Sequence, residues 1–134
     1  MTQIDLNKYA QFVSAVTSDQ SKNINSLQES LIGMRKEVDV PRMLTGAIGL
    51  ASETGEFNEI VKKCIFQGKP MNEETVYHMK RELGDIIWYW IQACASVKAD
   101  PNEIIQMNIE KLKNRYPGGE FNAYYSENRA ENDL

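Results

Sequence analysis

Two long stretches of helical apolar periodicity, separated by one short turn, constrain the fold of this chain more than any other feature. The first follows Pro41, a residue suited to the first turn of a helix, and stops at Gly68. The second begins after Asn72, which precedes two acids suited to a helix N-terminus, and continues to Val97. If the chain reverses at the turn between them, the two segments form an antiparallel helical hairpin.

Shorter helical patterns lie on either side of this hairpin. Apolar spacing predicts helices over residues 6–16 and 24–34, and a final helix that begins after Asp100 and ends near Tyr116. No segment shows sustained alternation of apolar and polar residues, and no internal repeat is present. The sequence therefore predicts an all-α fold.

The length of 134 residues suits a single domain, spanning 1–134, with its core at about 41–121. Residues 117–134 contain four acids, one arginine and little aliphatic content. We expect this segment either to pack on a partner subunit through Phe121, Tyr124 and Tyr125, or to end in a mobile tail at 122–134.

Composition and charge exclude several classes of function. The net charge of -4 at pH 7 offers no electrostatic footprint for a nucleic acid polymer or an anionic membrane. No apolar run approaches the roughly 20 residues needed to cross a bilayer, and the start lacks the pattern of a secretory signal. We therefore expect a cytoplasmic protein with no membrane partner, in which Cys64 and Cys94 are reduced core residues.

Four carboxylates are placed symmetrically about the expected turn. Counting outward from Lys69, Glu56 and Glu82 each lie thirteen residues away. Glu53 and Asp85 each lie sixteen residues away. At about 1.5 Å per residue, an antiparallel hairpin brings all four to one level, roughly 20 Å from the turn. Carboxylates 4 Å apart repel by about 4 kcal/mol per pair at an effective dielectric near 20, so this cluster needs a cation. Mg²⁺ prefers oxygen ligands and often arrives with substrate phosphates, which predicts an enzyme acting on a phosphorylated molecule.

Other polar side chains are candidates for holding that substrate. Asn108, Lys111 and Arg115 share one face of the last helix and could grip phosphates, although a solvated amphipathic face is the alternative. Lys63 follows the Glu-rich segment and could neutralise a carboxylate or contact a phosphate. Tyr89 continues the carboxylate stripe and could line a nucleoside pocket, unless it is a core residue.

These motifs together resemble the MazG-type all-α nucleoside triphosphate pyrophosphohydrolases. The chain carries E-x-x-E at 53–56, E-x-x-D at 82–85 and K-x-x-x-R-Y-P at 111–117, and the resemblance covers about residues 41–121. Many relatives have an additional acid just before each acidic motif, where this chain has Ser52 and Arg81.

The resemblance implies a four-helix-bundle-like fold that assembles into a homodimer or homotetramer. It implies Mg²⁺, with Mn²⁺ as a substitute, held by Glu53, Glu56, Glu82 and Asp85. The implied reaction cleaves a (d)NTP to a monophosphate and pyrophosphate, with Lys111 and Arg115 on the phosphates. In the mechanism that we expect, the metal activates a water, and Glu53 or Glu56 is the catalytic base.

Two alternatives remain open from the sequence. One is the related phosphoribosyl-ATP pyrophosphohydrolase, which has similar helices and acids. The other is a non-catalytic helical oligomer whose acids merely bind ions. A ferritin-like di-iron centre is disfavoured, because it needs Glu-x-x-His pairs and the single histidine, His78, is unsuitably placed.

Overall fold

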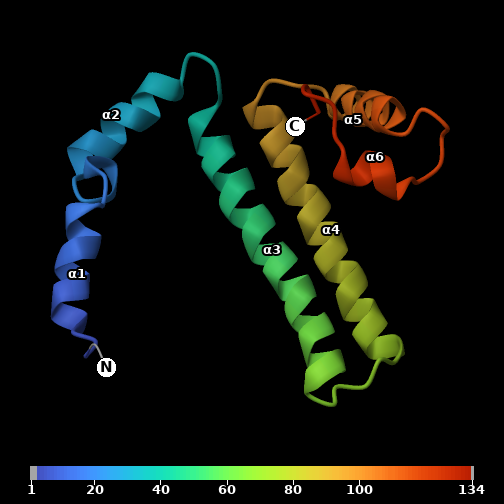
Figure 1. Cartoon of the computed structure of the whole chain (residues 1–134), viewed down its shortest axis with the longest axis horizontal. Helices are drawn as coiled ribbons and strands as arrows, with labels where there is room; N and C mark the ends of the chain where they lie inside the picture. Colours follow the sequence, from blue (N-terminus) through green and yellow to red (C-terminus); the bar gives the residue numbers. More distant parts are fainter. Residues whose placement is uncertain (1–2, 134) are drawn as a thin grey trace.

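The structure is a computed structural model that describes residues 3–133, and its helices are drawn in Figure 1. The described elements are α1 (Leu6–Ala15), the short 3-10 helix η1 (Asp19–Ser21), α2 (Ile24–Met34), α3 (Val40–Phe66), α4 (Glu73–Ser96), α5 (Pro101–Arg115) and α6 (Ala123–Glu127). Residues 3–133 contain no strand, so the prediction of an all-α fold is confirmed. Residues 1, 2 and 134 of the expected domain lie outside the described residues. None of the described helices is both long and apolar enough to span a bilayer.

Side-chain caps determine where the helices of the hairpin begin. The Asp39 carboxylate accepts a hydrogen bond from the backbone N–H of Arg42 at 3.2 Å, at the start of α3. At the start of α4, the Asn72 side-chain oxygen accepts from the N–H of Thr75 at 2.9 Å. Such caps satisfy backbone donors that have no partner inside the helix. The predicted helix start after Asn72 is therefore confirmed.

The turn between α3 and α4 is held from both sides. Gly68 has φ of +69°, a left-handed conformation that glycine adopts without the penalty of a Cβ atom, and it follows the end of α3. On the other side, the Thr75 hydroxyl donates to the carbonyl oxygen of Pro70 at 2.8 Å, and Thr75 is buried. The reversal predicted between the two long helices is therefore present.

The two long helices run side by side (Figure 1), and two glycines of α3 lie close against α4. A Cβ atom placed on Gly49 would lie 2.1 Å from the Cδ1 atom of Tyr89. One placed on Gly46 would lie 2.9 Å from the Cα atom of Ala93. Gly49 and Tyr89 are each twenty residues from Lys69, so the symmetric register predicted from the sequence is confirmed.

The far end of the hairpin is closed by a backbone hydrogen bond. The N–H of Asp39 donates to the carbonyl oxygen of Ser96 at 2.8 Å and joins the start of α3 to the end of α4. Val40 and Cys94 are the buried apolar residues of the described chain, and Cys94 confirms its prediction as a core thiol. Cys64 is only half-buried, and its thiol is free as predicted.

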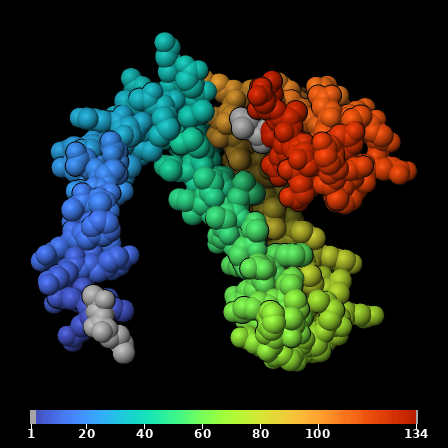
Figure 2. Space-filling view, viewed as in Figure 1, coloured from blue at the N-terminus to red at the C-terminus, as the bar shows by residue number. Residues whose placement is uncertain are grey.

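Much of the remaining apolar surface is uncovered. The arm made by α1, η1 and α2 stands away from the hairpin in the space-filling view of Figure 2. On this arm, Leu6 is 73% exposed and Phe12 is 60% exposed. On α4, Ile87 and Trp88 are each 54% exposed. A folded chain usually buries such side chains, because each one fully buried contributes about 1.5–3 kcal/mol.

We predict that Gly49→Ala will destabilise the hairpin while Gly55→Ala will not. The new methyl group at position 49 must displace the Tyr89 ring, which should cost about 1–3 kcal/mol of unfolding free energy. Gly55 lies in the same helix with nothing within 4 Å of an added Cβ atom. Its replacement should stabilise by about 0.5–1 kcal/mol through helix propensity. Urea unfolding of both variants checks this, and wild-type stability for Gly49→Ala would contradict the packing described.

Candidate active site

Three of the four predicted carboxylates meet between α3 and α4. Glu53, Glu82 and Asp85 each offer one carboxylate oxygen, and these three atoms all lie within 4.8 Å of one another. Glu56 is exposed and lies outside this group. The structure therefore brings together the acids of both helices at the predicted level, with Glu56 at the margin.

One oxygen of this three-carboxylate group has no partner. The Oε2 atom of Glu82 is buried and makes no hydrogen bond with any described residue. Leaving a buried acceptor unsatisfied costs about 1–3 kcal/mol, and more when the group is charged. A cation between the carboxylates would satisfy this atom and offset their mutual repulsion.

The electrostatics of Glu53 reflect the same crowding. Partial burial raises the pKa of its carboxyl above the ordinary value of 4.5, and the negative charge of Glu56 raises it further. The nearby carboxylates of Glu82 and Asp85 act in the same direction. Every cause therefore favours a proton on Glu53 when no metal ion is bound.

The donor set indicates the kind of cation that would fit. All three candidate ligand atoms are carboxylate oxygens, and no histidine or cysteine belongs to the group among the described residues. Oxygen-only sites suit Mg²⁺ or Mn²⁺ better than the softer transition metals. The residues present, including the unpartnered oxygen of Glu82, therefore fit a hard divalent cation.

Lys63 does not join the three-carboxylate group directly. Its ammonium forms an ion pair with Glu59, one turn earlier in α3, with an N–O distance of 2.9 Å. A hydrogen bond from Lys63 and its positive charge, with a smaller effect of Lys62, lower the pKa of Glu59. Both side chains of the pair are about half exposed, so this is a solvated surface contact.

Tyr89 lies between the helices rather than at an open pocket. Its ring occupies the space above Gly49 and makes an edge contact with Trp88 at a centroid distance of 4.9 Å. Tyr89 thus packs one turn beyond Asp85, on the side of the hairpin away from the turn. In this single chain its described contacts are those of a packing residue.

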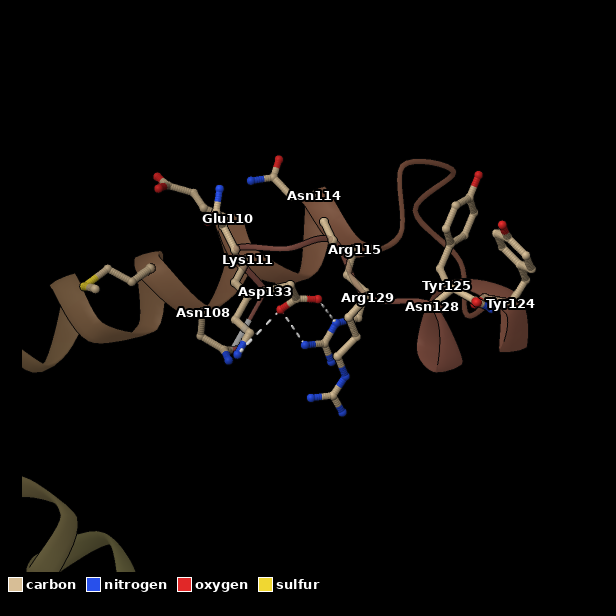
Figure 3. A pocket seen from close by; sticks show the side chains of 13 residues that line it. Asn108, Glu110, Lys111, Asn114, Arg115, Tyr124, Tyr125, Asn128, Arg129 and Asp133 are labelled. Carbon is tan, nitrogen blue, oxygen red and sulfur yellow. Dashed lines mark hydrogen bonds and ion pairs between the residues drawn. The ribbon is translucent and has the colours of Figure 1, made fainter.

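The predicted phosphate-binding residues line a pocket that does not contain the three-carboxylate group. Asn108, Lys111 and Arg115 face a pocket of about 890 Å³ between α5 and the tail, shown from close by in Figure 3. None of the four predicted metal-binding carboxylates lines this pocket. The single chain therefore presents the acids and the cations at separate places.

The tail provides a residue that the sequence analysis missed. Arg115 donates from Nε and Nη2 to the two carboxylate oxygens of Asp133, at 2.5 and 2.6 Å (Figure 3). This pairing lowers the pKa of Asp133, and the charges of Lys111 and Arg129 lower it further. The structure places the tail on α5 of its own chain, whereas the sequence predicted a mobile tail or one packed on a partner subunit. No periodic spacing links position 133 to position 115, so pattern alone carried no signal for it.

Comparison with known protein families identifies the family of this chain. The family model of the MazG nucleotide pyrophosphohydrolase domain matches residues 43–119, which is more than half of the chain. The match includes both acidic motifs and the basic motif of α5. No curated protein and no solved structure matches the chain. The resemblance noted in the sequence is confirmed, and the chain belongs to the MazG nucleotide pyrophosphohydrolase family.

Proposed function

We propose that this protein is a Mg²⁺-dependent nucleoside triphosphate pyrophosphohydrolase. In the reaction, water cleaves the bond between the α- and β-phosphates of a (d)NTP and releases a (d)NMP and pyrophosphate. The observation that carries the proposal is the three-carboxylate group of Glu53, Glu82 and Asp85, with its unpartnered Glu82 oxygen. Membership of the MazG family supports a hydrolase acting on nucleotides.

The carboxylates of this group are the residues that would hold the metal. Glu53, Glu82 and Asp85 would be direct ligands, and Glu56, three residues after Glu53 on α3, would complete the acidic surface. Mg²⁺ is the proposed ion, with Mn²⁺ as a substitute. When bound, it would supply positive charge for the phosphates and acidity for a water molecule.

We assign Glu56 as the general base. Of the two candidates from the sequence, Glu53 belongs to the three-carboxylate group and so would be occupied as a ligand. Glu56 lies outside the group, is exposed, and is close enough for its charge to raise the pKa of Glu53. A carboxylate in this position could take a proton from the attacking water while the ligands stay in place.

Binding of the phosphates is the proposed role of Asn108, Lys111 and Arg115. A guanidinium binds two phosphate oxygens at once, and an ammonium adds a point charge. Because these residues and the acids lie at separate places in one chain, we propose that a second copy contributes to a complete site. Lys63, on the exposed surface of α3, would contact a phosphate there, whereas Tyr89 would support the site through its packing against Gly49.

The assembly would be a homodimer or homotetramer. Its support is the exposed apolar surface of the hairpin and the arm, where Ile48 is 68% exposed and Phe12 is 60% exposed. Burying these apolar faces against a second copy would stabilise the assembly, for the same reason that burying apolar side chains stabilises a core.

The first test is a screen of phosphoribosyl-ATP and all common ribo- and deoxyribonucleoside triphosphates with Mg²⁺, scored for the monophosphate product and pyrophosphate. We expect Glu82→Gln and Asp85→Asn to lower kcat/KM by at least about 100-fold, because loss of a ligand should exceed the loss typical of an outer residue. Glu29→Gln is the control, and it should retain turnover because Glu29 is an exposed acid of α2 outside the three-carboxylate group.

Wild-type activity in Glu82→Gln would contradict the assignment. Turnover of phosphoribosyl-ATP in place of the other triphosphates would favour the related pyrophosphohydrolase of that substrate. No turnover of any triphosphate would favour a non-catalytic oligomer that binds ions.

The second prediction concerns pH in the absence of metal. Because the pKa of Glu53 is raised in the folded state, its contribution to stability is present below pH 4.5 and is lost as pH rises through the raised value. Glu53→Gln should therefore gain stability relative to wild type as pH rises in EDTA. Glu59→Gln should show the opposite trend, because the pKa of Glu59 is lowered. Thermal unfolding across a pH series checks both signs.

Adding Mg²⁺ should offset the loss of stability that Glu53 causes as pH rises in EDTA. The ion competes with the proton, so the rise in melting temperature that it causes should grow with pH and should be absent in Glu82→Gln. An equal rise in the wild type and in Glu82→Gln would show that Mg²⁺ binds elsewhere.

The third prediction concerns assembly. Light scattering on the full chain should give twice or four times the mass of 15.3 kDa. Ile87→Asp should shift the protein toward smaller species, because it places a charge on an exposed apolar face of α4. A monomer at all concentrations would contradict a site that needs a second copy.

A further inference from the structure

The tail places an anion on the cations of α5. The two carboxylate oxygens of Asp133 occupy the guanidinium fork of Arg115, at 2.5 and 2.6 Å. The ammonium of Lys111 lies 3.7 Å from the Oδ1 atom of the same carboxylate. The side chains of Arg115 and Asp133 are 13% and 11% exposed, so this pair is shielded from water. The most buried ion pair of the described chain is therefore made by the residue that we assign to phosphate binding.

A carboxylate held in this way uses the same donors as a phosphate would. Two parallel N–H donors of arginine match two oxygens of either group, and the geometry is specific to planar, bidentate recognition. Arg129 also lines this pocket, and its charge contributes to the lowered pKa that keeps Asp133 ionised. Figure 3 shows the carboxylate lying between α5 and the tail, among these cationic side chains.

We propose that Asp133 is an internal competitor for the phosphate subsite formed by Lys111 and Arg115. The tail, residues 122–133, must then release Arg115 before a phosphate of the substrate binds there. This inference rests on the proposed function, in which these two cations receive phosphates. It adds an autoinhibitory contact that the chain itself provides.

The construction of the tail suits such a release. Its helix, α6, has five residues, and local hydrogen bonds hold it: the Asn122 side chain accepts from the N–H of Tyr124, and the Asn128 side chain donates to the Tyr124 carbonyl, each at 2.9 Å. Tyr124 and Tyr125 are 67% and 39% exposed, and no residue of α6 is buried, so apolar burial holds the tail only in part. The tail can leave α5 without disturbing the packing of α3 on α4.

The affinity of the site then depends on how often the tail is released. For a ligand that binds only the released form, the apparent affinity is the intrinsic affinity multiplied by the fraction of molecules in that form. A substitution that removes the Asp133 carboxylate but keeps the size of the side chain should raise the released fraction and so raise the apparent affinity. We expect Asp133→Asn to bind pyrophosphate about tenfold more tightly than wild type.

The test is calorimetric titration of the full chain with pyrophosphate in EDTA, where no divalent ion can bridge the ligand to the acids. Asp133→Glu restores a carboxylate and should return the affinity toward that of wild type. Glu131→Gln is the matched control, since Glu131 is an exposed acid of the same tail. It should bind as wild type does. Equal or weaker binding by Asp133→Asn would overturn the proposal and make Asp133 a residue that builds the pocket.

Turnover of a triphosphate separates this inference from the function on which it rests. If Asp133 competes with substrate, Asp133→Asn should lower KM and leave kcat unchanged. An active wild type with no fall in KM for Asp133→Asn would overturn the competitor role and leave the proposed function standing. If neither protein hydrolyses any triphosphate, the proposed function fails, and the pyrophosphate titration alone decides whether Asp133 guards an anion site.

Discussion

The close approach of α3 and α4 at Gly49 governs the position of everything else in the hairpin. The Tyr89 ring lies where a side chain on residue 49 would be, so a glycine at this position allows the helices to pack closely at this register. Four residues further along α3 is Glu53, and four residues before Tyr89 is Asp85. The packing contact and the acids are therefore one helical turn apart on both helices. Steric fit, which carries no charge, thus determines where the charges meet.

The single chain leaves two kinds of group without stabilising contacts. The first is electrostatic, because the Glu82 oxygen is buried without a partner and Glu53 is driven toward protonation. The second is a lack of apolar burial, since Val40 and Cys94 are the only buried apolar residues in the range 3–133. A bound cation would give the Glu82 oxygen a partner, and a second copy of the chain would bury the exposed apolar side chains. Both remedies are parts of the proposed function.

The sequence predicted the helices and the register because these depend on local rules. Asn72 and Gly68 act within one turn of their own positions, and counting from Lys69 fixes height along an antiparallel pair. How far each helix is rotated about its axis depends on tertiary packing rather than on spacing along the chain, and the structure places Glu56 outside the group of three. The pairing of Asp133 with Arg115 was missed because it joins an irregular segment to a helix. Such a contact depends on where the chain folds back, and periodicity carries no information about that.

The space shared by residues 49 and 89 also bears on how relatives of this protein can diverge. An added methyl group at position 49 and a smaller ring or side chain at position 89 would each be damaging alone, yet together they would restore the occupied volume. The two positions should therefore coevolve as a compensating pair, whereas Gly55, with open space around it, is free to drift. A relative with a smaller residue than tyrosine at position 89 would need a larger residue at position 49 to keep the acids of α3 and α4 at the same height.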